Sequence, residues 1–346
     1  MTNRSPAFKL STMPLTSSQT AQSTERPSSP EAVLIGVDVG GTKIEVCALR
    51  HPSSKDLSSL GQFLYRERLP TPQGDYPATI ELIHTLVEQC CQTLQIQWPQ
   101  CVGLGIPGTL DPQTQTVRGS NSLVLNGQAM AQDLRNRLAC DVVLQNDANC
   151  FALSEAMDGA GHGHAMVFGV IIGTGCGGGI VHHRQIWGGA NRLGGEWGHT
   201  PLPWANELER QRAPCWCKKP LCMERFVSGT GFEEDHLLAS GLPLKAPAIV
   251  ELASAGNAQA RASLERYIDR LARGLSMVVN ILDPDCIVLG GGMSLVDELY
   301  TPLEAKLSSY CFHEGSRTPI LKAVHGDSSG VRGAAWLSQA PAKRPG

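Results

Sequence analysis

The sequence predicts an α/β protein built from two similar halves. Two observations carry this prediction. A buried strand, a glycine turn and a returning strand occur together near residue 33 and again near residue 166. In each half, further apolar strand-like segments alternate with segments of helical periodicity. The 346 residues are enough for two domains with sizeable cores.

Hydrophobic spacing places the elements of the first half. Gly40-Gly41-Thr42 turns the chain between the first two strands, which predicts a hairpin rather than a strand–helix unit. Apolar residues at helical spacing, including Ile80, Ile83 and Leu86, predict a helix after the third strand. The expected elements, in order, are strands 33–39, 44–49 and 62–68, helix 77–94, strand 101–105, helix 133–138, strand 142–144 and helix 148–157.

The second half repeats the theme with a second glycine turn, expected over Gly173–Gly178. A long amphipathic helix is expected to stop at Asp283-Pro284, since proline does not continue a helix. The expected elements are strands 166–172 and 179–182, helix 258–282, strand 286–289 and a closing helix 331–337. Two glycine hairpins, each opening a half, indicate a duplicated architecture.

Composition narrows the functional classes. The net charge is −3, so bulk electrostatics indicate neither a nucleic-acid partner nor a membrane partner. No apolar run approaches the roughly 20 residues of a membrane-spanning helix. The twelve cysteines occur without a secretory signal, so a disulfide framework is not expected. Residues 1–31 are rich in Ser, Thr and Pro and predict a disordered tail. Sparse basic residues disfavour the alternative of an organelle transit peptide.

The first glycine turn has the features of a phosphate site. Asp38 precedes Gly40, Gly41, Thr42 and Lys43, which places a carboxylate beside backbone N–H groups that a phosphate can approach closely. Asp38 is a candidate for Mg²⁺, directly or through water. The alternative is a plain tight hairpin.

The second glycine turn contains a misleading motif. Gly173-Thr-Gly-Cys-Gly-Gly178 satisfies the dinucleotide-binding pattern G-x-G-x-x-G, but that pattern must open a helix. The residues that follow, 179–182, read as a strand, so a nicotinamide cofactor is disfavoured. The chain also contains no P-loop motif.

One histidine and three cysteines predict a metal site. His199, Cys215, Cys217 and Cys222 supply the four ligands of a closed tetrahedral zinc site. A closed site has no open position for chemistry, so its expected role is to hold a loop rigid. Glu196 and Glu224 lie close to these ligands in the sequence, and their carboxylates suit hydrogen bonding to a polyol.

Asn146-Asp147-Ala-Asn149 marks a junction where a strand ends and a helix begins. A carboxylate is favoured at a helix N-terminus by the dipole and by free N–H groups. From the local sequence alone, an N-cap is the favoured interpretation of Asp147, ahead of a catalytic group.

The region from Gly195 to Glu224 resembles the ROK family (repressors, open reading frames and sugar kinases). Family members carry Gly-Glu-x-Gly-His followed by Cys-x-Cys-Gly-x-x-Gly-Cys-x-Glu, and the ligand spacing here is the same. Lys218 and Leu221 replace the two inner glycines, so the loop is expected to differ in shape. The resemblance extends from about residue 33 to residue 337.

The resemblance implies the two-lobed, actin-like ATPase fold of hexokinase and Hsp70, with a cleft between two α/β lobes. It implies an N-terminal lobe over 32–145 and a C-terminal lobe with the zinc loop over 146–326. The segment 327–346 would return as a helix to the first lobe.

The resemblance also implies roles for individual residues. Asp147 would be the general base that takes the proton of the attacking sugar hydroxyl. His199 would use one ring nitrogen for zinc and the other for sugar. The residues implied for sugar are Asn126, Asn146, Glu196, His199 and Glu224, and those implied for ATP in the second half are Thr174, Gly175, Gly290, Gly291 and Gly292.

The resemblance therefore implies a cytoplasmic, homodimeric ATP-dependent hexose kinase with structural Zn²⁺ and with Mg²⁺ bound to ATP. Leu125-Asn-Gly-Gln128, Trp197 between Glu196 and Gly198, and the stretch 325–336 look most like the fructokinase (mannokinase) branch. Fructose would then be the first substrate and mannose the second. Kinases of N-acetylglucosamine or glucose are the alternative. A non-catalytic sensor or repressor is less favoured, because residues 1–31 are too few and too polar for a helix-turn-helix.

Overall fold

The computed structural model describes residues 33–51, 61–313, 315 and 317–339. The expected disordered tail over 1–31 lies outside the described residues. The strands are β1 Val33–Val39, β2 Lys43–Arg50, β3 Phe63–Pro70, β4 Cys101–Ile106, β5 Thr109–Leu110, β6 Val117–Arg118, β7 Asp141–Asn146, β8 Met166–Ile172, β9 Cys176–His182, β10 Gln185–Ile186, β11 Cys286–Gly290 and β12 Ile320–Lys322. The α-helices are α1 Tyr76–Leu94, α2 Met130–Leu138, α3 Asp147–Asp158, α4 Glu207–Arg210, α5 Glu224–Val227, α6 Gly229–Ser240, α7 Ala246–Ser254, α8 Ala258–Leu282, α9 Tyr300–Tyr310 and α10 Ser329–Leu337.

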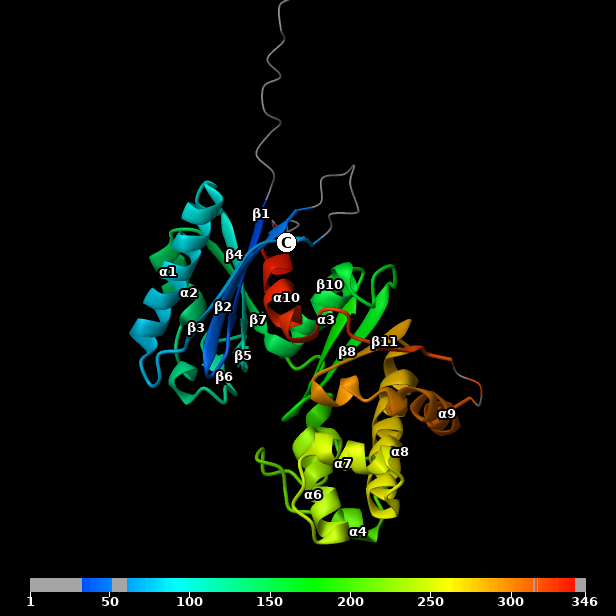
Figure 1. Cartoon of the computed structure of the whole chain (residues 1–346). Helices are drawn as coiled ribbons and strands as arrows, with labels where there is room; N and C mark the ends of the chain where they lie inside the picture. The colour runs from blue at the N-terminus through cyan, green and yellow to red at the C-terminus, as the bar shows by residue number, and fades with distance from the viewer. Residues whose placement is uncertain (1–32, 52–60, 314, 316, 340–346) are drawn as a thin grey trace, which may run out of the picture. The chain divides into compact units, whose positions relative to one another are not determined.

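The first sheet has the strand order β3-β2-β1-β4-β7. β1 pairs antiparallel with β2 across the glycine turn and parallel with β4, which in turn pairs parallel with β7. Apolar side chains of these strands and of α1 and α2 form one core cluster, which includes Val37, Ile83 and Leu134. In Figure 1, α1 and α2 lie together beside this sheet. The parallel strands β1, β4 and β7 end at the same edge of the sheet, and this arrangement brings Asp38 and Asp147 near each other.

The second sheet repeats the first. Its order is β10-β9-β8-β11-β12, with an antiparallel β8–β9 hairpin followed by the parallel pairs β8–β11 and β11–β12. The core on this side includes Phe168, Phe226 and Tyr267 and involves α5, α6, α7, α8 and α9. The expected α/β architecture with two similar halves is confirmed.

A pair of helices, α3 and α10, forms a third core with residues of both sheets (Figure 1). Glycines permit this packing because the backbones approach very closely. A Cβ atom added at Gly333 of α10 would lie 1.7 Å from the carbonyl oxygen of Cys150 in α3. A Cβ atom added at Gly36 of β1 would lie 2.1 Å from the backbone nitrogen of Ala335 in α10. A larger residue at Gly333 would force α10 away from α3, and a larger residue at Gly36 would force α10 away from β1.

Most expected elements appear within a few residues of their predicted bounds, and helix 258–282 matches α8 at both ends. Asn257 caps α8 by accepting a hydrogen bond from the N–H of Ala260. The second glycine turn is shorter than expected, because β9 already begins at Cys176. Helices α4–α7 and α9 were not predicted. In α6, the buried residues are Gly231, Phe232, Asp235 and His236, so Phe232 is the one large apolar side chain among them.

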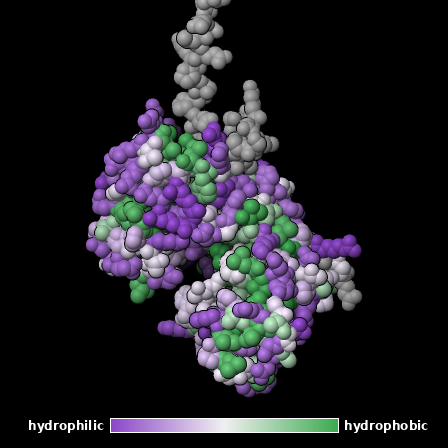
Figure 2. All heavy atoms as spheres, viewed as in Figure 1, coloured by the Kyte–Doolittle hydropathy of each residue, from purple (hydrophilic) through white to green (hydrophobic). Residues whose placement is uncertain are grey.

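Within the part of the chain that the structure describes, no helix is long and apolar enough to cross a membrane. Figure 2 shows a surface on which hydrophilic groups surround separate hydrophobic ones.

Candidate active site

The first glycine turn is held by hydrogen bonds to its carbonyl groups. The Thr71 hydroxyl donates to the carbonyl oxygen of Gly40 at 2.7 Å, and the Gln73 side-chain amide donates to that of Gly41 at 2.8 Å. These contacts fix the peptide planes of the turn before any ligand arrives. Gly40, Gly41 and Thr42 line a pocket of about 640 Å³.

Asp38 lies beside this turn, near the end of β1, in a densely packed environment. Cβ atoms added at Gly105 of β4 and Gly330 of α10 would lie 3.2 and 3.1 Å from its carboxylate oxygens. Burial raises the pKa of Asp38 to about 7, and the charges of Asp147 and Glu45 add to the rise. Mg²⁺ prefers carboxylate and phosphate oxygens. The Asp38 carboxylate beside the glycine turn therefore fits a site for the Mg²⁺ that accompanies a nucleotide.

Asp147 is the first residue of α3, and its neighbour Asn146 caps the helix. The Asn146 side chain accepts from the N–H of Ala148 at 2.9 Å and donates to the carbonyl oxygen of Gly108 at 3.1 Å. Asn146 therefore occupies the N-cap position, and Asp147 is the first residue of the helix. The Asp147 carboxylate also accepts a 2.8 Å hydrogen bond from the N–H of Ala148.

The surroundings of Asp147 favour a base that works near neutral pH. Desolvation by the protein atoms around the carboxylate, together with the negative charge of Glu196, raises the pKa of Asp147 to about 6. The hydrogen bond from Ala148 acts in the opposite direction. Glu196 is therefore close enough to Asp147 to influence the pKa of the Asp147 carboxyl, as expected if both residues belong to one sugar site.

His199, Cys215, Cys217 and Cys222 come together as the sequence predicts. One ligand atom from each lies within 4.8 Å of all the others. The Cys217 and Cys222 sulfurs are 3.5 Å apart, and the Cys215 sulfur lies 3.7 Å from Nδ1 of His199. Zinc–sulfur bonds of about 2.3 Å in a tetrahedron separate the sulfurs by about 3.8 Å, so this donor set fits Zn²⁺. Because Nδ1 belongs to this cluster, Nε2 of His199 is the ring nitrogen left for a substrate.

The loop between the cysteines keeps a glycine-like backbone without glycine. Lys218 and Leu221 have φ angles of 68° and 63°, in the left-handed region. From the sequence, the replacement of two glycines by Lys218 and Leu221 was expected to change the shape of the loop. Instead, both residues adopt the conformation that glycine takes freely, at a cost of about 1–2 kcal/mol each.

Glu224 connects the cysteine loop to the second glycine turn. Its Oε1 accepts from the indole N–H of Trp216 at 2.7 Å, and its Oε2 accepts from the backbone N–H of Cys176 at 3.3 Å. A few residues later, the N–H of Gly229 donates to the carbonyl oxygen of Gly173 at 2.7 Å. The cysteine loop, Glu224 and the glycine turn therefore form one connected unit.

Two residues used to predict the sugar, Asn126 of the expected sugar site and the neighbouring Trp197, have other contacts. The Asn126 side chain accepts from the N–H of Ser120 and donates to its carbonyl oxygen, both at 2.9 Å, and so orders its own loop. Trp197 is only 6% exposed, and its indole N–H donates to the carbonyl oxygen of Gly177 at 3.0 Å. Its ring meets Phe168 edge-on at 6.0 Å, which makes it a core residue.

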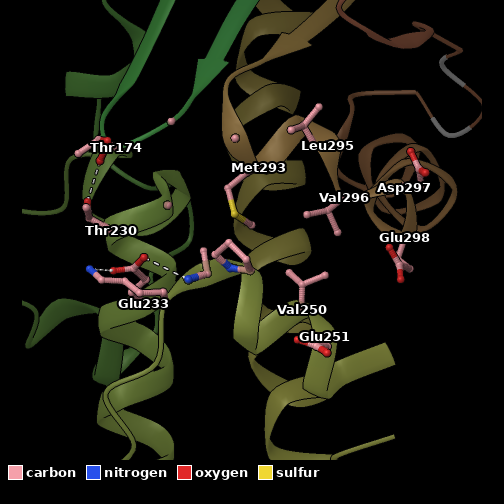
Figure 3. Close-up of a pocket in the computed structure, with 16 residues that line it drawn as sticks. Thr174, Thr230, Glu233, Val250, Glu251, Met293, Leu295, Val296, Asp297 and Glu298 are labelled. Atoms are coloured by element: carbon pink, nitrogen blue, oxygen red, sulfur yellow. Dashed lines mark hydrogen bonds and ion pairs between the residues drawn. The ribbon is translucent and has the colours of Figure 1, made fainter. Parts of the chain in front are cut away.

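A pocket of about 800 Å³ opens between the second glycine turn, α6, α7 and the segment after β11 (Figure 3). Thr174 and Gly292, two of the residues implied for ATP, line it, and the Thr230 hydroxyl donates to the Thr174 carbonyl oxygen at 2.8 Å. Gly291 has a φ angle of 81°, and an added Cβ atom would meet Gly173 at 2.8 Å. This close approach brings the loop after β11 against the glycine turn.

The far wall of this pocket was not predicted. It is formed by side chains of α7 and of the residues after Gly292, of which Val250, Leu295 and Val296 are apolar and Glu251 and Glu298 are acidic (Figure 3). No motif marks these residues in the sequence. Their only signal is a short apolar run in α7, which any surface helix also shows.

Comparison with known proteins gives consistent results. The model of the ROK family matches residues 34–340. The N-acetyl-D-glucosamine kinase of Photobacterium profundum is 37% identical over 309 residues, covering 88% of this chain and 98% of that protein. The enzyme of the same name from Escherichia coli K12 is 37% identical over 306 residues, covering 87% of this chain and 98% of that protein.

Solved structures resemble the whole described chain. A ROK hexokinase from Thermus thermophilus superposes with a TM-score of 0.76 at 26% identity, covering 88% of this chain and 97% of that one. A ROK-family glucokinase from Streptomyces griseus, in complex with glucose and AMPPNP, gives a TM-score of 0.67 at 26% identity, covering 88% of this chain and 99% of that one.

Proposed function

Because this chain belongs to the ROK family of sugar kinases, we propose that it transfers the γ-phosphoryl group of ATP to the 6-hydroxyl of N-acetyl-D-glucosamine. One observation carries the choice of sugar. The chain is 37% identical to N-acetyl-D-glucosamine kinases of two genera, over 98% of the length of each. The family model matches residues 34–340, a range that contains both glycine turns and the cysteine loop.

This choice reverses the order of the two branches considered from the sequence. The fructokinase branch was placed first partly on Trp197, but the structure buries that side chain in the core, where a sugar does not reach it. The Asn126 amide, a second argument, is occupied with the backbone of Ser120. N-acetylglucosamine, the alternative in the sequence analysis, is therefore the proposed substrate, and glucose is the next candidate.

The proposed mechanism assigns each substrate to residues described above. The adenosine of ATP would occupy the pocket between α6, α7 and the loop after β11, and its phosphates would lie against the two glycine turns. Asp38 would hold the Mg²⁺, whose charge offsets that of the phosphates. Such reactions depend mainly on positioning and charge neutralisation.

On the sugar side, Asn146, Glu196, Nε2 of His199 and Glu224 would hydrogen-bond to hydroxyl groups. Zn²⁺ on the cysteine loop would keep His199 and Glu224 in fixed positions. Asp147 would accept the proton of the 6-hydroxyl as that oxygen attacks the γ-phosphorus. Closure of the site around both substrates would exclude water, which is a competing acceptor of the phosphoryl group.

The proposal is tested by identifying the product. Incubation with Mg-ATP and N-acetylglucosamine is expected to yield equimolar ADP and a sugar phosphorylated at O6, as read by phosphorus and carbon NMR. The 6-deoxy analogue is expected to bind as a competitive inhibitor without turnover. ADP release that is no faster with N-acetylglucosamine than without a sugar would overturn the proposal.

The raised pKa of Asp147 predicts an acid limb in the pH–rate profile. A base must be ionised, and a pKa of about 6 means that the ionised fraction falls as the pH drops below that value. With both substrates saturating, kcat is expected to fall about tenfold per pH unit well below pH 6. Steady-state assays between pH 5 and pH 8 measure this, and a kcat that stays flat down to pH 5 would contradict the role of Asp147.

A further inference from the structure

Trp216 lies between two of the predicted zinc ligands and is the most exposed of the six tryptophans, at 69%. An indole left in water on a short loop gains little from burial, so its packing area does not explain its position. Its contacts are with two groups of the expected sugar site.

The first contact is the hydrogen bond from the indole N–H to Oε1 of Glu224, at 2.7 Å. Hydrogen bonds to a charged acceptor are short and roughly twice as strong as neutral ones. The N–H contact of this carboxylate with the backbone of Cys176, to Oε2, is longer, at 3.3 Å, and the Cys215 sulfur lies 3.6 Å from Oε1. Trp216 therefore provides the strongest of these restraints on the orientation of Glu224.

The second contact is with His199. The two rings meet edge to face, with centroids 5.0 Å apart and an interplanar angle of 85°. This is the preferred geometry of an aromatic pair. It restricts rotation of the imidazole, whose Nδ1 belongs to the cysteine cluster and whose Nε2 is available to a substrate.

We propose that Trp216 is a positioning residue of the sugar site, which holds Glu224 through its N–H and braces His199 with its ring. The inference rests on the proposed function, because it assumes that Glu224 and His199 bind the sugar. Groups that are fixed before binding lose less conformational entropy when the sugar arrives. The effect therefore belongs to sugar affinity rather than to the chemical step.

The test compares two substitutions of Trp216. Trp216→Phe removes the N–H and keeps an aromatic ring, whereas Trp216→Ala removes both contacts. Trp216→Phe is expected to raise the KM for N-acetylglucosamine about tenfold, in line with the loss of one hydrogen bond to a charged group. The kcat and the KM for ATP are expected to stay within about twofold, since this bond acts on sugar affinity. Trp216→Ala is expected to raise the sugar KM further.

Trp98 offers a matched control. It is 38% exposed, and its indole N–H also donates a 2.7 Å hydrogen bond, in this case to the carbonyl oxygen of Leu138. Trp98→Phe therefore loses an equivalent bond outside the site and is expected to leave both KM values unchanged. Zinc content per chain, measured by atomic emission, is expected to be equal in all the phenylalanine variants.

Two results would overturn the inference. The first is a sugar KM in Trp216→Phe within twofold of the wild-type value. The second is loss of zinc from Trp216→Phe, which would make the residue a structural part of the metal loop. The proposed function can fail separately. If the wild-type enzyme prefers another sugar, the same variants are assayed with that sugar, and the same KM criterion decides. If calorimetry detects no sugar binding to the wild-type protein, both proposals fall.

Discussion

Replacing Asp147 by asparagine is expected to lower kcat by about three orders of magnitude, within the range found for general bases. The amide keeps the shape of the side chain but does not accept a proton. Asn146, Glu196 and Glu224 are unchanged in this variant, so the affinity for N-acetylglucosamine, measured by calorimetry without ATP, is expected to stay within a few-fold. Single-turnover assays with excess enzyme measure the chemical step directly.

The variant is also expected to fold at least as well as the wild-type protein. A carboxylate whose folded pKa lies above its unfolded value contributes stability at low pH and loses that contribution as the pH rises through the folded pKa, here about 6. At pH 7 the ionised Asp147 therefore favours unfolding, and asparagine removes this effect. Asp141→Asn, at the exposed start of β7, the strand that leads into Asp147, is the matched control. Residual activity above a tenth of the wild-type value, or a fall in the midpoint of thermal unfolding, would contradict this account.

The second large effect is expected from Cys217→Ser, which removes one predicted zinc ligand. Loss of a ligand is expected to release zinc, because the four donors act together. The KM for the sugar is expected to rise at least tenfold, an effect comparable to the loss of outer-shell support in metal sites. The KM for ATP is expected to rise as well, since Glu224 and Gly229 link the loop to the second glycine turn.

Cys140→Ser provides the comparison. Cys140 is half-buried like Cys217 but lies between α2 and β7, away from the four ligands. The Cys140→Ser protein is expected to keep its zinc and to show unchanged KM values for the sugar and for ATP. A Cys217→Ser protein that retained one zinc per chain, or that lost zinc with unchanged kinetics, would refute the proposed role of the cluster. An increase in the sugar KM alone would show that the loop and the glycine turn are not coupled.

The parts of this fold that follow from the sequence are those with strong local signals. Long apolar periodicity predicted α8, and glycine turns between apolar runs predicted both hairpins. The spacing of one histidine and three cysteines predicted a cluster that the structure brings within 4.8 Å. The role of Asp147 needed the family resemblance, because strand-to-helix junctions with an aspartate are common and the local sequence left its part open.

Other features depend on tertiary contacts that have no local signature. Trp197 follows Glu196, a predicted sugar ligand, in the sequence. Its side chain nevertheless packs in the core. The far wall of the pocket beside the second glycine turn comes partly from α7, which carries no motif. The backbone of Lys218 and Leu221 is set by the cluster around it, against the preference of both residues. In each case, neighbours distant in the sequence decide the outcome.

The substrate is the central claim, and a direct competition of sugars tests it. Initial rates of ADP release would be measured with saturating Mg-ATP and with N-acetylglucosamine, glucose, mannose and fructose, each over the same concentration range. The account predicts the highest kcat/KM for N-acetylglucosamine, by at least about tenfold, because a site built to hydrogen-bond a substrate group discriminates strongly against analogues lacking it. A higher kcat/KM for fructose or glucose than for N-acetylglucosamine would contradict it.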